Sequence, residues 1–148
     1  MKPFEVQTII GCEATQVALQ AAVDRAAQEG VKINVAAVDA AGNLAGFLRM
    51  PGAPLHSIDI AIDKAYTAAS FSCPTGDWDQ ILANGSVGFR EGIVQRPRFT
   101  PFGGGMPIWI DRELIGAIGV SGASEAQDVL CAEAALASIG ADQLREAV

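Results

Sequence analysis

Apolar residues alternate with other residues over residues 31–37, which is the periodicity of a strand. Turn residues follow at 39–43, and the apolar segment 44–50 is expected to return as the partner strand of a β-hairpin. Prolines close this hairpin. Beyond them, apolar residues recur every three or four positions, which predicts a helix over residues 57–70 with Ser57 as its N-cap.

The same order of elements recurs in the second half of the chain. Residues 106–110 and 114–120 are expected to form a second hairpin around a tight turn. Ser124 and Gln127 then form a capping box at the start of a helix over residues 125–138. Two hairpin–helix units predict an α/β (α+β) fold in which helices flank a central antiparallel sheet.

Alanine-rich helices are a further feature of the pattern. One is expected over residues 13–29 and ends at Gly30, a residue suited to a left-handed C-terminal cap. Alanines recur in the last predicted helix. Small side chains let helices pack closely, either within the core or between subunits.

Length and charge limit the class of protein. The chain has 148 residues, half of them hydrophobic, which suits one domain over residues 1–148. The formal charge of −7, without a block of basic residues, argues against nucleic acid and anionic membranes as partners. No apolar run reaches the length of a membrane span, and the N-terminal residues lack a signal-peptide pattern, so we expect a cytoplasmic protein.

Cysteine and histidine give little support for a metal site. Cys12, Cys73 and Cys131 are widely spaced, which favours free thiols over disulfides or a zinc site. His56 is the single histidine, so a site that needs two imidazoles from one chain is excluded. The Gly-x-Ser-x-Gly motif of a hydrolase nucleophile does not occur.

A run of three glycines is the main candidate for a ligand site. Gly103, Gly104 and Gly105 follow Phe102 at the entry to the second hairpin. Such a run exposes backbone N–H groups to an anion, although a bulged strand entry is the alternative. The irregular segment over residues 73–105 is long for a compact domain, with one short helix expected at 77–83, and such segments usually carry function.

Two helix starts are expected to contribute to the same site. Ser121 and Gly122 lead into the last helix, and Ser57 begins the helix after the first hairpin. Free N–H groups and the helix dipole favour negative charge at such positions. Helix capping alone is the alternative explanation for these polar residues.

The cations Arg49 and Lys64 are the predicted partners of an acidic ligand. Both would otherwise be solvated or paired on the surface, and Asp59 and Asp63 lie on the same predicted helix as Lys64. In a catalytic interpretation, Lys64 or His56 would move a proton while Arg49 holds a carboxylate.

Aromatic residues gather in and around the irregular segment. They are expected either to wall a flat apolar ligand or to form the core of that lobe. The residues are Trp78, Phe89, Phe99, Phe102 and Trp109.

Five ordered blocks carry a resemblance to a known family. They are residues 38–44 (VDAAGNL), 49–53 (RMPGA), 57–69 (SIDIAIDKAYTAA), 101–108 (PFGGGMPI) and 116–122 (GAIGVSG). In this order, over nearly the whole chain, they resemble the GlcG/HbpS family.

The resemblance implies a profilin-like, three-layer α/β/α domain that assembles into homo-oligomers, often octamers. Members include haem-binding and haem-handling proteins, the C-terminal part of PduO-type proteins, and small proteins encoded among catabolic enzymes. Haem or another acidic apolar molecule is therefore an expected ligand. Some haem-binding members carry a histidine in the first helix that has no counterpart here, which leaves His56 or Cys12 as the candidate axial ligand.

Three classes of function remain. The first is an oligomeric small-molecule-binding protein that holds haem or another acidic apolar ligand. The second is a small catabolic enzyme, a hydrolase or a tautomerase, that acts on an unsaturated or keto carboxylate. The third is an accessory protein that stabilises a partner enzyme. We place binding first because anion-receiving backbone features occur twice, whereas the sequence contains no complete set of acid, base and nucleophile.

Overall fold

The computed structural model describes residues 1–142, so the part of the predicted domain at 143–148 lies outside the described residues. Its elements follow the order α1 (Cys12–Gln28), β1 (Asn34–Asp39), β2 (Leu44–Arg49), α2 (Ser57–Phe71), η1 (Thr75–Asp77), α3 (Trp78–Asn84), α4 (Val87–Ile93), β3 (Gly105–Ile110), β4 (Glu113–Ser121) and α5 (Glu125–Ser138). The four strands form one antiparallel sheet in the order β2-β1-β4-β3.

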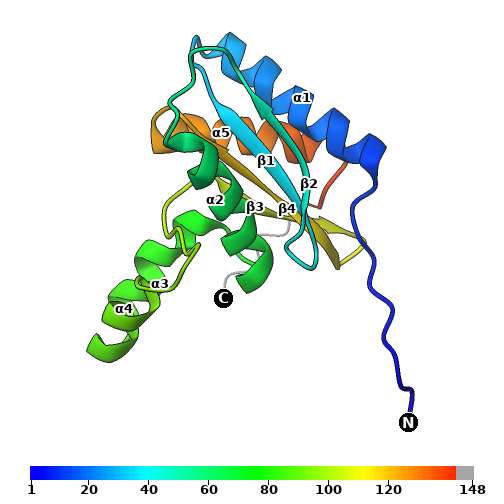
Figure 1. Cartoon of the computed structure of the whole chain (residues 1–148), viewed down its shortest axis with the longest axis vertical. Helices are drawn as coiled ribbons and strands as arrows, with labels where there is room; N and C mark the ends of the chain where they lie inside the picture. Colours follow the sequence, from blue (N-terminus) through cyan, green and yellow to red (C-terminus); the bar gives the residue numbers. More distant parts are fainter. Residues whose placement is uncertain (143–148) are drawn as a thin grey trace.

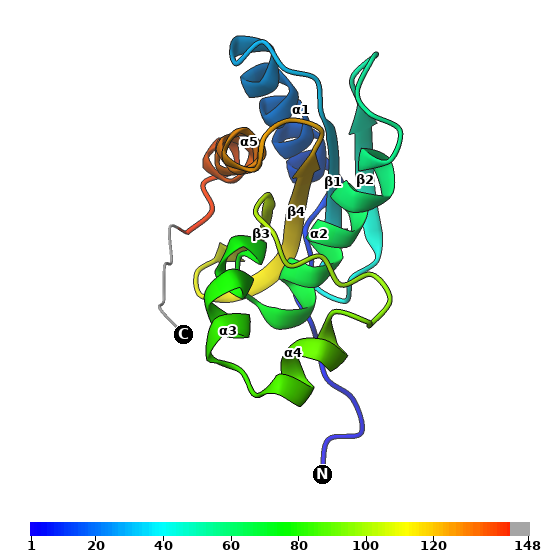
Figure 2. The same cartoon turned by 90° about the vertical axis from the view of Figure 1, so that its left-hand side faces the viewer.

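The sheet is the middle of three layers. Helices α1 and α5 cover one face, and α2 covers the other, with α3 and α4 in a lobe beyond it (Figure 1). Figure 2 shows the same layers from the side. The predicted α/β/α arrangement with two hairpin–helix units is therefore confirmed.

Strand β1 is buried on both faces, and the alternation of its side chains divides the core in two. Val35 and Ala37 join the cluster beneath α1 and α5. Ala36 and Val38 join the smaller cluster beneath α2. Because each face of β1 packs on a helix, the strand contains almost no exposed position.

Small residues bring α1 and α5 together as the alanine pattern predicts. Their buried members are Ala18, Ala22, Ala26, Ala132 and Ala135. The end of α1 also follows the prediction, because Gly30 has φ +69° and Val31 N–H donates to the Ala26 carbonyl at 3.0 Å. The capping box of Ser124 and Gln127 is present at the start of α5.

Two glycines allow α2 to lie directly on the sheet. A Cβ at Gly119 would collide with the Ala61 carbonyl, and one at Gly105 would lie 2.5 Å from the Lys64 carbonyl. Side chains at these strand positions would push α2 outward. The close approach sets how deeply the side chains of α2 reach between the helix and β4.

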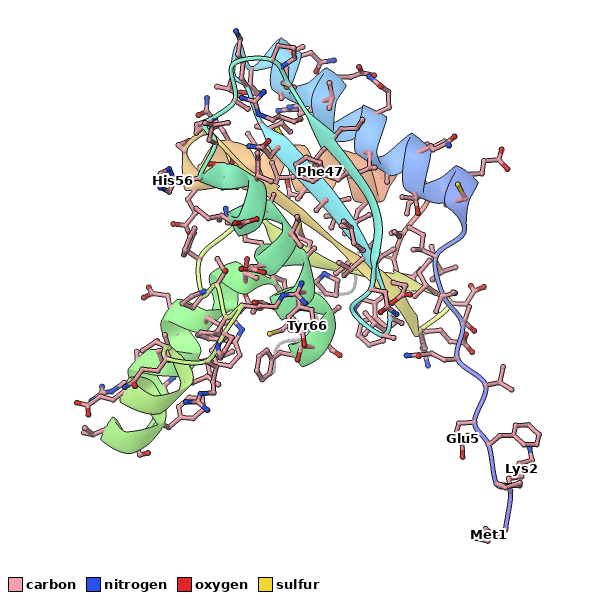
Figure 3. All side chains as sticks on the ribbon, in the orientation of Figure 1. Met1, Lys2, Glu5, Phe47, His56 and Tyr66 are labelled. Atoms are coloured by element: carbon pink, nitrogen blue, oxygen red, sulfur yellow. The ribbon has the colours of Figure 1, made fainter. Side chains whose placement is uncertain are left out.

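The start of α2 differs from the prediction. Ser57 is the first helical residue rather than the cap, and it is buried. His56 occupies the N-cap position without a side-chain capping bond. It lies exposed at the outer edge of the molecule (Figure 3).

The irregular segment contains one more helix than the sequence predicts. Helix α4 begins after Ser86, whose hydroxyl accepts a hydrogen bond from Phe89 N–H at 3.2 Å. None of its residues is buried, so it lacks the apolar stripe that marks the other helices. Trp78 anchors this lobe through ring contacts with Phe71, Phe89 and Phe99. Among the described residues, no helix is long and apolar enough to cross a membrane.

The buried thiol of Cys131 predicts a loss of stability at alkaline pH. Burial raises its pKa to about 11, whereas an exposed thiol ionises near pH 9.0. Between these pH values the unfolded chain releases a proton that the folded chain keeps, so the free energy of unfolding falls as pH rises. In urea unfolding from about pH 8 to about pH 11, the stability advantage of the wild type over Cys131→Ala should shrink. The exposed Cys12→Ala serves as control, and equal pH slopes for wild type and Cys131→Ala would contradict the prediction.

Candidate functional site

Lys64 is the largest fully buried side chain among the described residues, with an exposure of 1%. It extends from α2 toward β4 and α5. Its Nζ donates to the Val120 carbonyl at 2.9 Å and to Asp128 Oδ2 at 3.0 Å. A buried ammonium needs such oxygen partners because it has left the water that would otherwise solvate it.

Gly104 leaves the space that Lys64 occupies. Its φ is +120°, and a Cβ there would lie 2.8 Å from Lys64 Nζ and 2.5 Å from the Val120 carbonyl oxygen. Val120 N–H donates to the Gly104 carbonyl at 2.9 Å, while the Val120 carbonyl accepts the ammonium instead. Gly104, the middle glycine of the run, therefore makes room for the Lys64 ammonium in two ways: it has no Cβ, and it adopts a positive φ that other residues seldom adopt.

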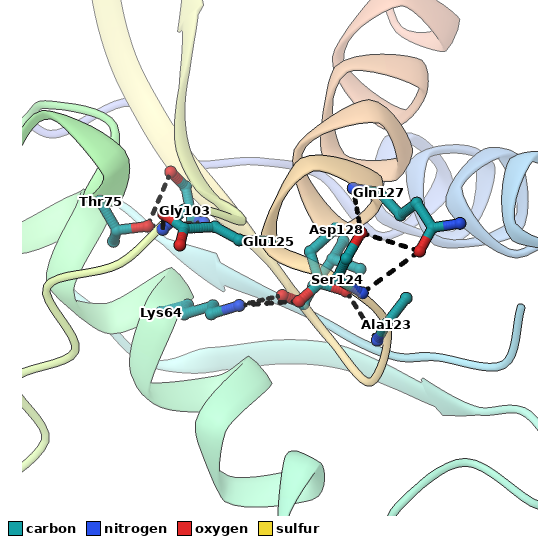
Figure 4. Close-up of polar contacts among 10 residues, drawn as sticks. Lys64, Thr75, Gly103, Ala123, Ser124, Glu125, Gln127 and Asp128 are labelled. Atoms are coloured by element: carbon teal, nitrogen blue, oxygen red, sulfur yellow. Dashed lines mark hydrogen bonds and ion pairs between the residues drawn. The ribbon is translucent and has the colours of Figure 1, made fainter.

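Asp128 is held by α5 and by the loop before that helix. Its Oδ1 accepts the Ala123 N–H at 3.1 Å, which leaves Oδ2 for Lys64. The carboxylate lies in the first turn of α5, where the helix dipole favours negative charge. Figure 4 shows this chain of contacts from α2 through Asp128 to the start of α5.

Burial shifts the two charges of the pair toward neutrality. It lowers the pKa of the Lys64 ammonium, and the negative charges of Asp128 and Glu125 oppose that shift. It raises the pKa of the Asp128 carboxyl, against the effect of Lys64 and of the Gly122 and Ala123 amides. A proton can therefore pass from Lys64 to Asp128 at a smaller cost than between exposed groups of these types.

The outer side of the pair is covered by the loop. The Phe102 ring centroid lies 4.8 Å from Lys64 Nζ, and this residue is 42% exposed. Beside it, Gly103 N–H donates to Glu125 Oε1 at 2.7 Å. A carboxylate of the protein thus accepts the hydrogen bond of a loop amide, next to a buried ammonium that lies under a partly exposed ring.

The last glycine of the run has a structural partner. Gly105 N–H donates to Thr75 Oγ1 at 2.8 Å, which fastens the strand entry to η1 (Figure 4). Thr75 is fully buried. The amides of Gly103 and Gly105 therefore have different surroundings, since one meets an exposed glutamate and the other an inaccessible hydroxyl.

The alternative interpretation, in which Lys64 pairs with acids of its own helix, is wrong. Asp63 pairs with Arg98 at 3.0 Å, and Asp59 is exposed. Lys64 instead pairs with Asp128, 64 residues further along the chain. Helical geometry explains the difference, because adjacent residues such as 63 and 64 point in directions about 100° apart.

The other predicted ligand residues divide into two groups. The Gly122 amide contributes to the surroundings of Asp128 and so belongs to the Lys64 site. Ser121 is buried at the end of β4, directly after Val120. Arg49 lies two strands away, opposite Asn34, and its guanidinium donates to the Ala53 carbonyl at 2.7 Å. Two strand spacings place it about 10 Å from β4.

The two candidate iron ligands lie at opposite ends of the sheet. Ile10, just before Cys12, bonds to Ile115 near the start of β4. His56 follows the loop that holds Asn34, which pairs with Ser121 at the end of β4. Six residues of strand separate these ends by about 20 Å. His56 is also about 12 Å from Lys64 along α2.

Asp128, Glu125 and Thr75 are site residues that the sequence analysis did not select. A signal existed for the charged pair. Lys64 falls within the helical stripe of Ala61, Ala65 and Ala68, and Asp128 falls within the stripe of Cys131, Ala132 and Ala135. A charge at a core position of an amphipathic helix indicates a buried partner of opposite sign.

Removing one member of the pair should be more harmful than removing both. Lys64→Met leaves Asp128 buried without its cation and is expected to lower the free energy of unfolding by about 3–5 kcal/mol. Lys64→Met/Asp128→Leu should recover most of this loss at neutral pH. Lowering the pH toward 4 should also stabilise the single variant. Without Lys64, the pKa of the buried Asp128 carboxyl rises further. The folded variant then binds a proton at a pH where the unfolded chain does not, so its free energy of unfolding increases.

Urea unfolding of the wild type, both single variants and the double variant measures this coupling. The assignment is contradicted if the double variant is no more stable than Lys64→Met.

Comparison with known proteins identifies the family to which this chain is similar. A family model described as "Haem degrading protein HbpS-like" matches residues 10–137. An uncharacterized 15.0 kDa protein from the dhaT-dhaS intergenic region of Citrobacter freundii is 34% identical over 91% of this chain and 94% of its own length. Corrinoid adenosyltransferase PduO of Salmonella typhimurium is 37% identical over 81% of this chain, but the match spans 36% of that enzyme.

Solved structures give the same assignment. The Klebsiella pneumoniae protein ORFY is 31% identical and superposes with a TM-score of 0.85 over 97% of this chain and 99% of its own. The PduOC:Heme complex is 32% identical, with a TM-score of 0.85 over 93% of this chain and all of that chain. HbpS is 32% identical, with a TM-score of 0.82 over 91% and 93%. The chain belongs to the HbpS-like family.

Proposed function

We propose that the protein binds a small molecule through an acidic group, which Lys64 and the loop of Phe102, Gly103 and Gly104 receive. One observation carries the proposal. A fully buried ammonium lies beneath a partly exposed aromatic ring, next to a loop amide that already holds a carboxylate. Glu125 provides that carboxylate from an exposed position, so it is the natural group for a ligand to displace.

The geometry supports such an exchange at low cost. Phe102 is an exposed side chain, so moving its ring opens a path to Lys64 with little loss of core packing. The N-terminal turn of α5 adds its positive dipole end. Because burial has already raised the pKa of Asp128, that carboxyl can take up a proton when a second anion arrives.

Haem is the ligand that the relatives suggest, through the PduOC:Heme complex and the family description. Haem would have to bind on an open surface beside Lys64, since Lys64 lines neither of two surface hollows in the described part of the chain. Hollows of about 150 Å³ and about 320 Å³ lie on the surface, and neither is lined by His56 or Cys12. These side chains lie at opposite ends of β4, so one chain offers a single axial ligand, and the porphyrin carboxylates would bind at Lys64.

We extend the proposal to a homo-oligomer, with an octamer suggested by the family resemblance. Strand β2 is an edge of the sheet and exposes Leu44 and Leu48. An edge strand with exposed apolar side chains is suited to contact with another copy. Location in the cytoplasm and a role among catabolic enzymes belong to the same proposal.

Porphyrin titrations test the acidic-group requirement. Protoporphyrin IX should bind more tightly than its dimethyl ester, which lacks the carboxylates. Glu125→Gln keeps an acceptor for Gly103 N–H but removes the competing charge, so it should tighten binding several-fold. Glu133→Gln, two turns further along α5, should leave the affinity unchanged. Absorbance and fluorescence titrations give the affinities, and equal affinity for acid and ester would contradict the proposal.

The variants also separate the site from iron ligation. Lys64→Met/Asp128→Leu should weaken protoporphyrin IX binding while it remains folded by circular dichroism. Haemin titrations followed at the Soret band, with His56→Ala and Cys12→Ala, identify an axial ligand. Loss of haemin binding in one of these variants, with protoporphyrin IX binding retained, would assign that residue to iron.

A second candidate function follows from the shifted pKa values of Lys64 and Asp128. Such paired shifts are common where a side chain moves a proton during catalysis. The enzyme would be a hydrolase or tautomerase acting on an unsaturated or keto carboxylate, with Lys64 as the proton-transfer group. Enol formation from phenylpyruvate, followed by ultraviolet absorbance, tests it. Turnover by the wild type that Lys64→Met/Asp128→Leu abolishes would place catalysis ahead of binding.

A further inference from the structure

The structure assigns a second small-molecule site to the hollow between α2 and the segment that follows α4, with a small aromatic carboxylate as its ligand. This hollow has a volume of about 150 Å³. Its walls include Tyr66 and Ser70 from α2, Phe71 at the end of that helix, and Arg96, Arg98 and Phe99 from the opposite segment. The site is separate from the Lys64 site and does not rest on the function proposed for it.

The hollow is positively charged within an acidic protein. The chain carries a formal charge of −7, yet the residues that line the hollow include two arginines and no acid. Arg98 is balanced by Asp63 at 3.0 Å. Arg96 makes no ion pair with any residue in the described range 1–142. A planar guanidinium without a partner beside an apolar wall suits a carboxylate, which it can bind through two parallel hydrogen bonds.

The aromatic walls contact one another and Arg98. The Arg98 guanidinium carbon lies 3.6 Å from the Tyr66 ring centroid. Phe71 and Phe99 are 6.0 Å apart at an interplanar angle of 84°, and both rings contact Trp78 at 4.7 Å. Rings at these angles can hold a flat ring by edge-to-face contact.

The backbone on the opposite wall is strained and held in place. Arg98 has φ +65°, a conformation that non-glycine residues seldom adopt. Thr67 holds it from α2, because its hydroxyl donates to the Arg98 carbonyl at 3.0 Å and accepts Thr100 N–H at 3.1 Å. This backbone conformation accompanies the contact of the Arg98 side chain with the Tyr66 ring. The neighbouring residues Arg96 and Phe99 line the same hollow.

Helix α2 separates this hollow from the Lys64 site. Tyr66 and Ser70 are four residues apart and share one face of the helix. At about 100° per residue, Tyr66 points about 160° away from Lys64 and Ser70 about 120° away. Both residues line the hollow, and each brings a hydroxyl group that can donate a hydrogen bond to a ligand.

Binding of benzoate tests the site, with benzamide as its uncharged analogue. In ¹H–¹⁵N NMR titrations of the whole chain, benzoate should give saturable shifts centred on residues 66–71 and 96–99, and benzamide should bind much more weakly. Arg96→Gln should weaken benzoate binding about tenfold, since one charge-assisted contact is lost. Arg90→Gln, an exposed arginine outside the hollow, should leave the affinity unchanged.

Three results would overturn the assignment. Benzamide could bind as tightly as benzoate, Arg96→Gln could have no effect, or Arg96→Gln could change the mass of the particle in solution, which would make this face a subunit contact. Lys64→Met/Asp128→Leu distinguishes the two sites. It should retain benzoate binding here, whereas loss of benzoate binding only in that variant would support the Lys64 site and remove this one.

Discussion

A lysine ammonium between a helix and a sheet needs oxygen partners, because the energy lost on leaving water is large. Lys64 finds these partners on two different elements, the Val120 carbonyl of β4 and the Asp128 carboxylate of α5. The pair therefore fixes α2, the end of β4 and the start of α5 in one arrangement. It also requires Gly104, because a side chain there would occupy the position of the ammonium. The arrangement of α2, the end of β4, the start of α5 and the glycine loop therefore depends on this one interaction.

The same interaction explains why the site lies where it does. A buried ion pair adds little net stability compared with apolar packing, so its retention suggests a use beyond folding. Around it lie the exposed side chains of Phe102 and Glu125, one apolar and one acidic. Together they resemble the two parts of an amphipathic carboxylic acid, and the ligand class in our proposal follows from that likeness. The haem complex of a relative agrees in chemistry, since porphyrins such as haem combine an apolar ring with carboxylates.

Much of the fold could be predicted from the sequence because it depends on local periodicity. Alternation over β1, alanines in α1 and α5, and the capping box at Ser124 all act over a few residues. Helix α4 could not be predicted in this way, since it buries no residue and carries no apolar stripe. Ser57 was expected to cap α2, but the turn before the helix places His56 at that position.

The site could be predicted only in part. The sequence indicated Lys64 and the three glycines, but not that the glycines fit around the lysine, because that contact joins segments 40 residues apart in sequence. Asp128 was not selected, because its place in the core stripe of α5 indicates a buried partner of opposite charge but does not identify Lys64 as that partner. Phe102 was grouped with the aromatic lobe, yet its ring covers Lys64, while Phe71 takes part in the cluster around Trp78.

Direct observation of the Lys64 ammonium during ligand binding is the most decisive measurement for this account. In protein labelled with ¹⁵N-lysine and ¹³C-aspartate, the Nζ resonance of Lys64 and the carboxyl resonance of Asp128 are followed by NMR while protoporphyrin IX is added. We predict that both resonances move together and saturate with the ligand, while those of the exposed Lys32 stay unchanged. Binding of protoporphyrin IX with the Lys64 and Asp128 resonances unmoved would contradict the central claim that this buried pair receives the ligand.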